Sequence, residues 1–377
     1  MSPPVLVRTC AVAAAVLVLA APAHAGAPPV SARAFLVQEA ATGEVLAQRA
    51  STARVPIASI TKLMTVLVAL EHARLDDVVG VRSDAAAVGE STINLRAGER
   101  ITVRDLVEAA LIQSANDAAD ALADHVGRGS TARFVAMMNA KARELGLTHT
   151  RFTRPDGLDA PGHLSTARDV TILAEAAMKS LAVRSIVRRR TDTIAGGRVL
   201  HTWNDLLGVF PGLLGVKTGH TSGAGWCEVG VARRHGVTLY VTVLGSPTRS
   251  QRNADLAALL RWGLTRYRPV WLVRPGRVYL RAEVGYGRAP LALVPAQPVV
   301  RPVRIDRPLV ERIVAPSALD LPVRRGARLG EVRVRSGRRL VARVPLVAAR
   351  SVSRPDFGGR VAFYAERTFS HLGDWFT

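Results

Sequence analysis

The sequence has 377 residues, 48% of them hydrophobic and 21% charged, so the chain can bury at least one complete core and its length favours two domains. The formal net charge of +21 is typical of nucleic-acid-binding proteins, but aromatic residues make up only 5% of the chain. We therefore predict no nucleic-acid partner, and anionic cell-surface material is the expected counterpart of the positive charge.

The first 25 residues have the pattern of a signal peptide. One positive charge, Arg8, precedes an apolar run from Ala11 to Ala21, and Ala23-His24-Ala25 is a small-x-small cleavage signature. The alternative is an uncleaved membrane anchor, although the run is short for a bilayer span. In either case the chain is predicted to leave the cytoplasm.

Strands and helices alternate in the next part of the chain. Two apolar segments, 34–37 and 44–47, flank Gly43 and predict a two-stranded hairpin. The segment 59–72 follows Pro56 and is apolar on most sides, which predicts a helix buried in a core. We infer a mixed sheet with strands from both ends of this part and helices inserted between them. The further predicted helices are 103–113, 117–126, 131–145, 166–179 and 254–265, and the further strands are 215–218, 227–232 and 238–244.

The composition changes near residue 268. Short apolar segments broken by Pro, Gly and Arg follow, and strands at such close spacing predict a small β-sandwich. The tail from residue 356 places Phe357, Tyr364 and Trp375 near one face of a helix that could lie flat on a membrane. The alternative is a terminal helix packed on its own protein. The candidate strands are 278–284, 291–294, 299–305, 310–315, 328–334 and 339–347.

Ser59 and Lys62 form a Ser-x-x-Lys pair at the start of the predicted buried helix. Positions i and i+3 project on the same side of a helix, so the hydroxyl and the amine can meet. A lysine desolvated in an apolar site loses its proton readily and can act as the base for a serine, whereas an arginine stays charged. Only four of the 51 basic residues are lysines, so a lysine here indicates chemistry that a guanidinium cannot do. By itself, the pair is better explained by a helix-capping serine and a solvated lysine, because such pairs arise by chance in many chains of this length.

Two further motifs follow in order along the chain. Ser114-Ala115-Asn116 lies in a short join between two predicted helices, where Ser114 can pass a proton toward a leaving amine. Asn116 can hold Lys62 and a substrate amide by hydrogen bonds. In the second motif, Lys217 brings a positive charge and Thr218 a hydroxyl, and both suit a substrate that ends in a free carboxylate.

The residues after Lys217 and Thr218 favour peptide binding. Gly219 leaves the edge of a strand bare, so an extended peptide can pair with its backbone. The backbone N–H groups of Ser59 and His220 are expected to stabilise an oxyanion. The His220 side chain is also explained by simple packing.

The three motifs resemble the Ser-x-x-Lys, Ser-x-Asn and Lys-Thr-Gly set of penicillin-binding proteins and class A β-lactamases. Longer stretches, at 155–159, 164–169, 217–225 and 357–376, resemble the low-molecular-mass penicillin-binding proteins, which are D-alanyl-D-alanine carboxypeptidases of serine peptidase family S11. The resemblance covers nearly the whole mature chain. It implies an α/β (α+β) fold with a penicillin-binding-protein/β-lactamase-like sheet and a helical subdomain. The implied segments are a signal peptide (1–25), the catalytic domain (26–267), a β-sandwich (268–352) and an amphipathic membrane-associating helix (353–377).

The same resemblance implies a serine-type carboxypeptidase that removes the terminal D-alanine from peptidoglycan stem pentapeptides, with β-lactams as covalent inhibitors. It places the protein at the periplasmic face of the cytoplasmic membrane, with the C-terminal helix on the anionic membrane surface. No cofactor and no metal are expected, since the histidines lack metal-binding spacing. The implied catalytic residues are Ser59, Lys62 and Ser114, and the implied substrate-binding residues are Asn116, Lys217, Thr218, Gly219 and His220.

One departure from the family concerns a second anchor for the substrate carboxylate. Some members have an arginine directly after the Gly-Gly that ends the last core strand, where this chain has Pro247 after Gly245-Ser246. Arg249 is predicted to substitute for it. The Glu-x-x-Leu-Asn loop of class A β-lactamases is absent from the sequence, so efficient antibiotic destruction is not expected. Two alternatives remain: a D,D-endopeptidase that uses the same residues, and a non-catalytic wall-binding or membrane-surface protein, which would leave the three motifs unexplained.

Overall fold

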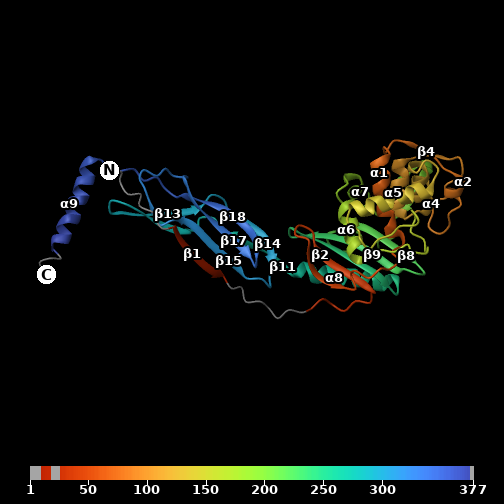
Figure 1. Ribbon diagram of the computed structural model, residues 1–377, viewed down its shortest axis with the longest axis horizontal. Coiled ribbons are helices and arrows are strands. Elements are labelled where there is room, and N and C mark those ends of the chain that lie inside the picture. The colour runs from red at the N-terminus through yellow and green to blue at the C-terminus, as the bar shows by residue number, and fades with distance from the viewer. Residues whose placement is uncertain (1–9, 18–25, 374–377) are drawn as a thin grey trace. The chain divides into compact units, whose positions relative to one another are not determined.

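The computed structural model describes residues 10–17 and 26–373, with the side chains of the last helix described as far as residue 365. The chain divides into two compact units, Ala25–Thr265 and a second unit that contains the chain from Arg266 onward and an N-terminal segment (Figure 1). The predicted cleavage site lies outside the described residues. Strand β1 (Cys10–Leu17), within the predicted signal peptide, pairs antiparallel with β15 (Leu309–Pro316) in the second unit. Removal of this segment stays a prediction.

The first unit is built on a five-stranded sheet in the order β3-β2-β10-β9-β8. The predicted hairpin is confirmed as β2 (Ala34–Glu39) and β3 (Glu44–Arg49), and β2 pairs with β10 (Val237–Ser246) from the other end of the unit. Every pair in this sheet is antiparallel, so the predicted mixed sheet is wrong. Short turns join β8 (Leu213–Thr221), β9 (Gly225–Arg234) and β10, and connections this short join antiparallel strands. Strand β8 lies at the edge of the sheet.

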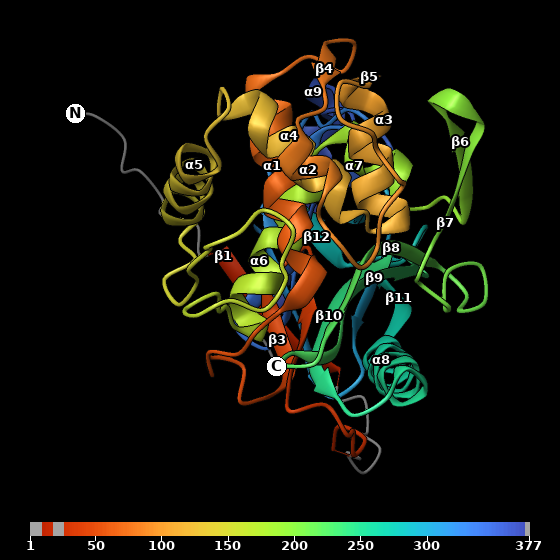
Figure 2. The ribbon, with the colours of Figure 1, turned by 90° about the vertical axis from the view of Figure 1, so that its right-hand side faces the viewer.

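Helices cover both faces of the sheet. Helix α6 packs on β10 and β2, while α8 packs on β9 and β10 from the other side, as Figures 1 and 2 show. The predicted helix after Pro56 is buried almost all round, from Leu63 to Ala69. The helices that match the sequence patterns are α1 (Lys62–His72), α3 (Val103–Glu108), α4 (Asn116–Val126), α5 (Thr131–Glu144), α6 (Ala167–Ala177) and α8 (Arg249–Thr265).

Two of these helices begin or end differently from the prediction. Helix α1 begins at Lys62, and Ala58–Thr61 form a 3-10 turn before it. Side chains three residues apart eclipse one another in a 3-10 turn, so this geometry places position 59 over position 62. Helix α3 continues as a π-helical turn, Ala109–Gln113. The elements without a sequence prediction are short: α2 (Ser83–Ala86), α7 (Leu181–Ile186), and the hairpins β4 (Val78–Gly80) with β5 (Arg100–Thr102) and β6 (Thr191–Ile194) with β7 (Arg198–His201).

The second unit contains a seven-stranded sheet and a two-stranded sheet around one core. Leu272 and Val303 of the two-stranded sheet belong to the same buried cluster as Val332 and Leu346 of the larger sheet. This arrangement matches the layered β-structure predicted from the short apolar segments. The strands are β11 (Tyr267–Val273), β12 (Leu280–Val284), β13 (Arg288–Pro295), β14 (Val299–Arg304), β15, β16 (Ala318–Leu319), β17 (Arg328–Ser336) and β18 (Arg339–Ala348).

The tail forms helix α9 (Phe357–Gly373). Phe357 and Tyr364 are mostly exposed, and the Phe363 and Tyr364 rings contact Tyr286 edge to face. Trp375, which the sequence placed on the same apolar face, lies outside the described residues. Within residues 10–17 and 26–373, no helix is both long enough and apolar enough to cross a bilayer.

Candidate active site

Ser59 and Lys62 meet at the junction between the 3-10 turn and α1. The Lys62 amine donates a hydrogen bond to the Ser59 hydroxyl over 2.8 Å between Nζ and Oγ. Ala58 has a φ of 50°, so the chain enters this turn through a left-handed residue. The structure therefore brings together the hydroxyl and amine that the sequence paired.

The Lys62 amine is fully buried and surrounded by oxygens. Besides Ser59, it donates to Asn116 Oδ1 at 2.7 Å and to the Asp156 carbonyl at 2.6 Å, so all three ammonium donors are used. Burial lowers the pKa of Lys62 to about 8, although the nearby carboxylates of Asp156 and Asp120 act to raise it. About a tenth of such amines are neutral at pH 7. A neutral amine can keep its bonds to Asn116 and Asp156 and accept the Ser59 proton.

Ser114 and Asn116 are positioned by the turn between the π-helical segment and α4. Ser114 is left-handed, with φ of 65° and ψ of 30°, and Asn116 is the first residue of α4. The Asn116 side-chain amide donates to the Gly89 carbonyl at 2.9 Å, which leaves its oxygen directed at Lys62. Ser114 Oγ accepts a hydrogen bond from Lys217 Nζ at 2.7 Å. The second and third motifs are thus joined in space as well.

Lys217 and Thr218 lie on edge strand β8. Lys217 is 2% exposed, and burial, together with the positive charges of Lys62 and Arg252, holds the pKa of its amine well below the usual value. The sequence analysis assigned Lys217 a positive charge. In the structure this charge depends on neighbouring carboxylates, because a buried amine without a nearby negative charge favours the neutral form.

Gly219 is required by the close approach of β8 to the turn that carries Ser59. A Cβ atom at this position would lie 2.9 Å from the Ile57 carbonyl oxygen and 3.0 Å from the Ser59 nitrogen. The next residue, His220, stacks on Trp226 with ring centroids 4.0 Å apart. The backbone of 219–220 is therefore held beside the Ser59 N–H.

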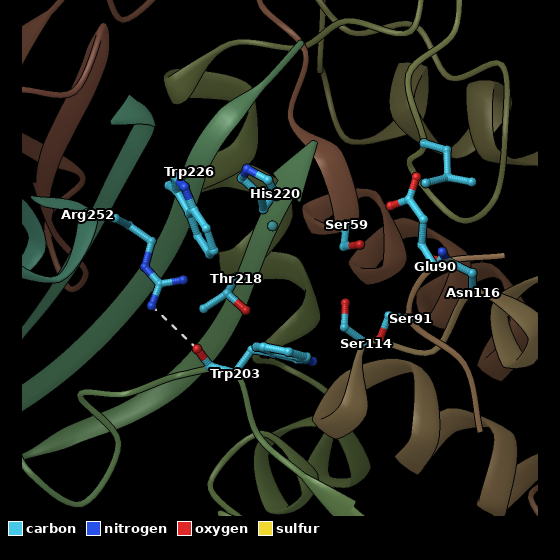
Figure 3. Close-up of a pocket in the computed structure, with 12 residues that line it drawn as sticks. Ser59, Glu90, Ser91, Ser114, Asn116, Trp203, Thr218, His220, Trp226 and Arg252 are labelled. Atoms are coloured by element: carbon cyan, nitrogen blue, oxygen red, sulfur yellow. Dashed lines mark hydrogen bonds between the residues drawn. The ribbon is translucent and has the colours of Figure 1, made fainter. Parts of the chain in front are cut away.

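A cavity of about 250 Å³ opens over these groups (Figure 3). In Figure 3 the Ser59, Ser114 and Thr218 side chains face the same space, and Trp203 and Trp226 stand beside it. Lys62 and Lys217 lie behind this lining and reach it through their hydrogen bonds to Ser59 and Ser114. The lining residues are Ser59, Glu90, Ser91, Ser114, Asn116, Leu158, Trp203, Thr218, Gly219, His220, Trp226 and Arg252.

Arg249, the predicted second anchor, is not among the residues that line the cavity. Its Nε donates to Asp205 Oδ2 at 2.8 Å, and its guanidinium lies 5.1 Å from the centre of the Trp203 ring. The arginine that lines the cavity is Arg252, which the sequence interpretation missed. One signal for it exists: it lies three residues after Arg249, on the same side of a helical segment.

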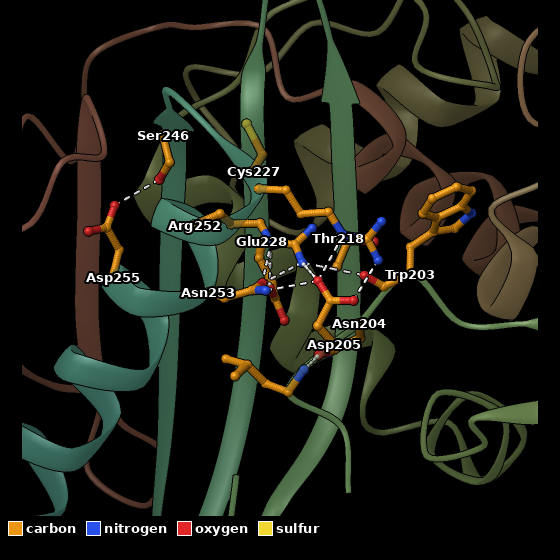
Figure 4. Close-up of polar contacts among 12 residues, drawn as sticks. Trp203, Asn204, Asp205, Thr218, Cys227, Glu228, Ser246, Arg252, Asn253 and Asp255 are labelled. Atoms are coloured by element: carbon orange, nitrogen blue, oxygen red, sulfur yellow. Dashed lines mark hydrogen bonds and ion pairs between the residues drawn. The ribbon is translucent and has the colours of Figure 1, made fainter. Parts of the chain in front are cut away.

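Arg252 is buried in a network of polar side chains behind the cavity wall (Figure 4). Its side chain is 1% exposed, its Nε lies 3.1 Å from Glu228 Oε2, and its Nη2 lies 3.2 Å from Asp205 Oδ2. Its guanidinium also lies 5.7 Å from the Trp226 ring. Cys227 is buried, and this burial raises the pKa of its thiol to about 11, which disfavours the reactive thiolate.

Comparisons with known proteins agree with this arrangement. Residues 21–248 match the model of peptidase family S11, described as D-alanyl-D-alanine carboxypeptidase. The D-alanyl-D-alanine carboxypeptidase DacC of Escherichia coli is 31% identical over 93% of this chain and 92% of its own length.

Two solved structures show the same likeness. The D-alanyl-D-alanine carboxypeptidase DacD of Francisella tularensis is 25% identical, with a TM-score of 0.63 over 88% of this chain and 95% of its own. Penicillin-binding protein D2 of Listeria monocytogenes, solved with ampicillin bound, is 33% identical, with a TM-score of 0.57 over 62% of this chain and 98% of its own. The chain therefore belongs to the D-alanyl-D-alanine carboxypeptidases of family S11, which are serine-type hydrolases.

Proposed function

We propose that the protein removes the terminal D-alanine from peptidoglycan stem pentapeptides through an acyl-enzyme on Ser59. The observation that carries the proposal is the 2.8 Å contact between the Ser59 hydroxyl and a fully buried Lys62 amine. The neutral amine takes the hydroxyl proton as Ser59 Oγ attacks the carbonyl of the last peptide bond. That bond then breaks, D-alanine leaves, and water hydrolyses the ester.

Proton delivery to the leaving amine is assigned to Ser114. Its hydroxyl accepts a hydrogen bond from Lys217 at 2.7 Å, so its own proton is free to point into the cavity. After Ser114 donates its proton, Lys217 can restore it. At the acyl-enzyme Lys62 then holds the proton taken from Ser59 and Lys217 has given one up, so a proton must pass from Lys62 back to Lys217 through solvent before Lys62 can act as the base for the attacking water.

The backbone N–H groups of Ser59 and His220 are proposed to hold the developing oxyanion. The tight approach of Gly219 to the Ser59 nitrogen brings the two backbone segments together without side chains between them. Preorganised N–H donors of this kind stabilise charge that appears only in the transition state. Strand β8 is an edge strand, so the substrate peptide can pair with it while Thr218 receives its carboxylate.

Covalent labelling tests this proposal. Benzylpenicillin should add its full mass to Ser59, because the β-lactam carbonyl is attacked and its leaving group stays tethered; the related Listeria protein is known with ampicillin bound. Ser59→Ala should abolish both the adduct and D-alanine release from a D-Ala-D-Ala peptide. Intact-mass spectrometry and a D-alanine assay give the two readouts, and an adduct that persists in Ser59→Ala would overturn the assignment.

We further propose that the exported protein associates with an anionic membrane surface through α9. Phe357, Val361 and Tyr364 lie on this helix with more than half of their surface exposed. The chain from residue 266 to 356 carries 20 arginines against six acidic residues, a balance that attracts anionic lipid. Aromatic side chains with a basic neighbourhood are typical of interfacial helices.

Vesicle flotation tests the membrane proposal. The full chain should float with phosphatidylcholine vesicles that contain phosphatidylglycerol and bind weakly to phosphatidylcholine alone. A chain without residues 356–377 should stay at the bottom of the gradient and keep its peptidase activity. Equal flotation of the truncated chain would show that the helix is not the anchor.

A further inference from the structure

The first unit contains a buried carboxylate that the mechanism above does not use. Glu228 lies in the middle of β9 with no solvent-exposed surface, directly opposite Thr218 in the β8–β9 register. Residues directly opposite in an antiparallel pair share one face of the sheet, with Cβ atoms about 5 Å apart. A buried acid therefore stands next to the hydroxyl assigned to the substrate carboxylate.

Glu228 has an ion-pair partner but no hydrogen bonds to stabilise its charge. Its Oε2 lies 3.1 Å from Arg252 Nε, yet neither carboxylate oxygen accepts a hydrogen bond within the described residues. Burial raises the pKa of Glu228 to about 7, and Asp205 adds to the increase, while Arg252 and Lys217 oppose it. These three groups, from the loop before β8, from α8 and from β8, are the charges that act on it.

Arg252 connects this carboxylate to the cavity. Helix α8 packs on β9, and Arg252 lines the cavity together with Thr218 and Trp226. Figure 3 shows Arg252 on the same side of the cavity as Thr218 and Trp226, and Figure 4 shows Glu228 beside Arg252. An arginine stays charged at all relevant pH values, so it offers a permanent cation to whichever carboxylate is available.

We propose that Glu228 is an internal competitor of the substrate's terminal carboxylate for Arg252, and that it takes up a proton from solvent when that carboxylate binds beside Thr218. In the free protein, ionised Glu228 and Asp205 both balance the Arg252 guanidinium. In the complex, the substrate carboxylate would be a third anion beside this cation, and the fully buried Glu228 is protonated because like charges at this distance disfavour each other. Glu228 is thus a positioning residue, and this inference rests on the proposed function.

The thermodynamic linkage between anion binding and protonation of Glu228 determines whether affinity rises or falls with pH. Anion binding raises the pKa of Glu228, so deprotonation of Glu228 must weaken anion binding by the same factor. Affinity for a carboxylate-terminated peptide should therefore be highest below pH 7 and fall as the pH rises through the Glu228 pKa. Lys217 and Lys62 could produce the same trend, because loss of a proton from either amine also removes an attraction.

The experiment measures binding without turnover. A D-Ala-D-Ala peptide is titrated calorimetrically into Ser59→Ala protein and into the Ser59→Ala/Glu228→Gln double variant at pH 6 and pH 9. For Ser59→Ala we expect the Kd to rise about threefold to tenfold between pH 6 and pH 9. A further titration near pH 7.5, between the Glu228 pKa values of the free and bound protein, should show proton uptake as a buffer-dependent heat. Glu228→Gln should reduce the change to less than twofold, tighten binding at pH 9 and remove the proton uptake.

Two further variants make the result specific. Glu228→Asp keeps a carboxylate and should keep the pH dependence, which also guards against a folding defect in Glu228→Gln. Glu175→Gln removes another partly buried carboxylate of the same unit, one that is bonded to Gln38, and should behave like the parent. An unchanged slope in folded Glu228→Gln protein would assign the effect to the buried lysines, Lys62 and Lys217, and overturn the inference. Normal penicillin labelling of Glu228→Gln in the Ser59 background would show that the proposed function stands regardless.

Discussion

The two units of this protein use different cations in different ways. All four lysines lie in the first unit, and two of them, Lys62 and Lys217, are almost completely buried in the active site. The second unit has 20 arginines and no lysine between residues 266 and 356, and many of these side chains are exposed. Because burial can remove a proton from an amine but not from a guanidinium, the two buried lysines can take part in the proposed proton transfers, whereas the arginines of the second unit supply charge alone.

The largest expected effect comes from replacing the active-site lysine Lys62 with arginine. Lys62→Arg keeps the charge but cannot become neutral, so we expect kcat/KM for a D-Ala-D-Ala peptide and the rate of penicillin acylation to fall by about 10²–10⁴-fold. Lys141→Arg is the matched control, since Lys141 only forms ion pairs with Glu71 and Glu144, and it should stay within twofold. Near-normal turnover in Lys62→Arg would exclude the proposed base.

An intermediate effect is expected in the pH profile. Because Lys62 must be neutral to act as a base, kcat at saturating peptide should rise with pH and reach half of its maximum near pH 8, where the Lys62 pKa lies. The Asp120 carboxylate raises that pKa, and Asp120 itself has a pKa raised to about 7 by burial and by Asp156. Asp120→Asn should therefore move the rise to lower pH by less than one unit, with a twofold to fivefold gain between pH 7 and 8. Below pH 7 the gain should vanish, since Asp120 is then already neutral.

The control for this shift in the pH profile is Asp124, one turn after Asp120 on α4. Asp124 lies 3.8 Å from Arg82 and acts on Lys62 only through Asp120, whose pKa it raises, so Asp124→Asn should not reproduce the shift to lower pH. A profile measured from pH 5.5 to 9.5 with constant ionic strength resolves the difference. An alkaline shift in Asp120→Asn would mean that the carboxylate does not act on Lys62 by its charge.

The smallest effect is expected when an exposed arginine of the second unit is replaced by lysine. Arg335 is exposed on β17, so Arg335→Lys should change neither kcat/KM nor the affinity for anionic vesicles by more than twofold. Steady-state kinetics and vesicle flotation give the two measurements. A marked loss in either would show that guanidinium geometry, and not charge alone, matters on this surface.

Most of the site could be predicted from the sequence, because its catalytic and binding residues lie in three short motifs. Ser59 with Lys62, Ser114 with Asn116, and Lys217 with Thr218 each carry their residue types within four positions of one another, and the structure brings them to one cavity. Arg252 could not be found in this way, because its relevance comes from the packing of α8 against β9 and not from its neighbours in sequence. Arg249 was the arginine that fitted the family pattern, yet it bonds to Asp205.

The same limit applied to the fold. Apolar periodicity predicted the first hairpin and the buried helix after Pro56, since burial of one face leaves a mark in the sequence. Apolar periodicity does not give the direction of strand pairing, and the predicted mixed sheet proved antiparallel, as the short connections between β8, β9 and β10 require. The 3-10 turn at Ser59 was also missed, because it depends on how β8 approaches the backbone of Ile57 and Ser59.

By itself, the sequence determined which groups are available: a serine with an amine one turn away, and two polar motifs that follow in order. Because lysine is rare in this chain, the positions of Lys62 and Lys217 were informative. Only the tertiary structure decided what state those groups adopt. The pKa of Lys62, the conditional charge of Lys217 and the competition between Glu228 and a substrate for Arg252 all depend on burial and on charges from distant segments. Solvation free energies depend on the full three-dimensional surroundings of a group, which no short stretch of sequence contains.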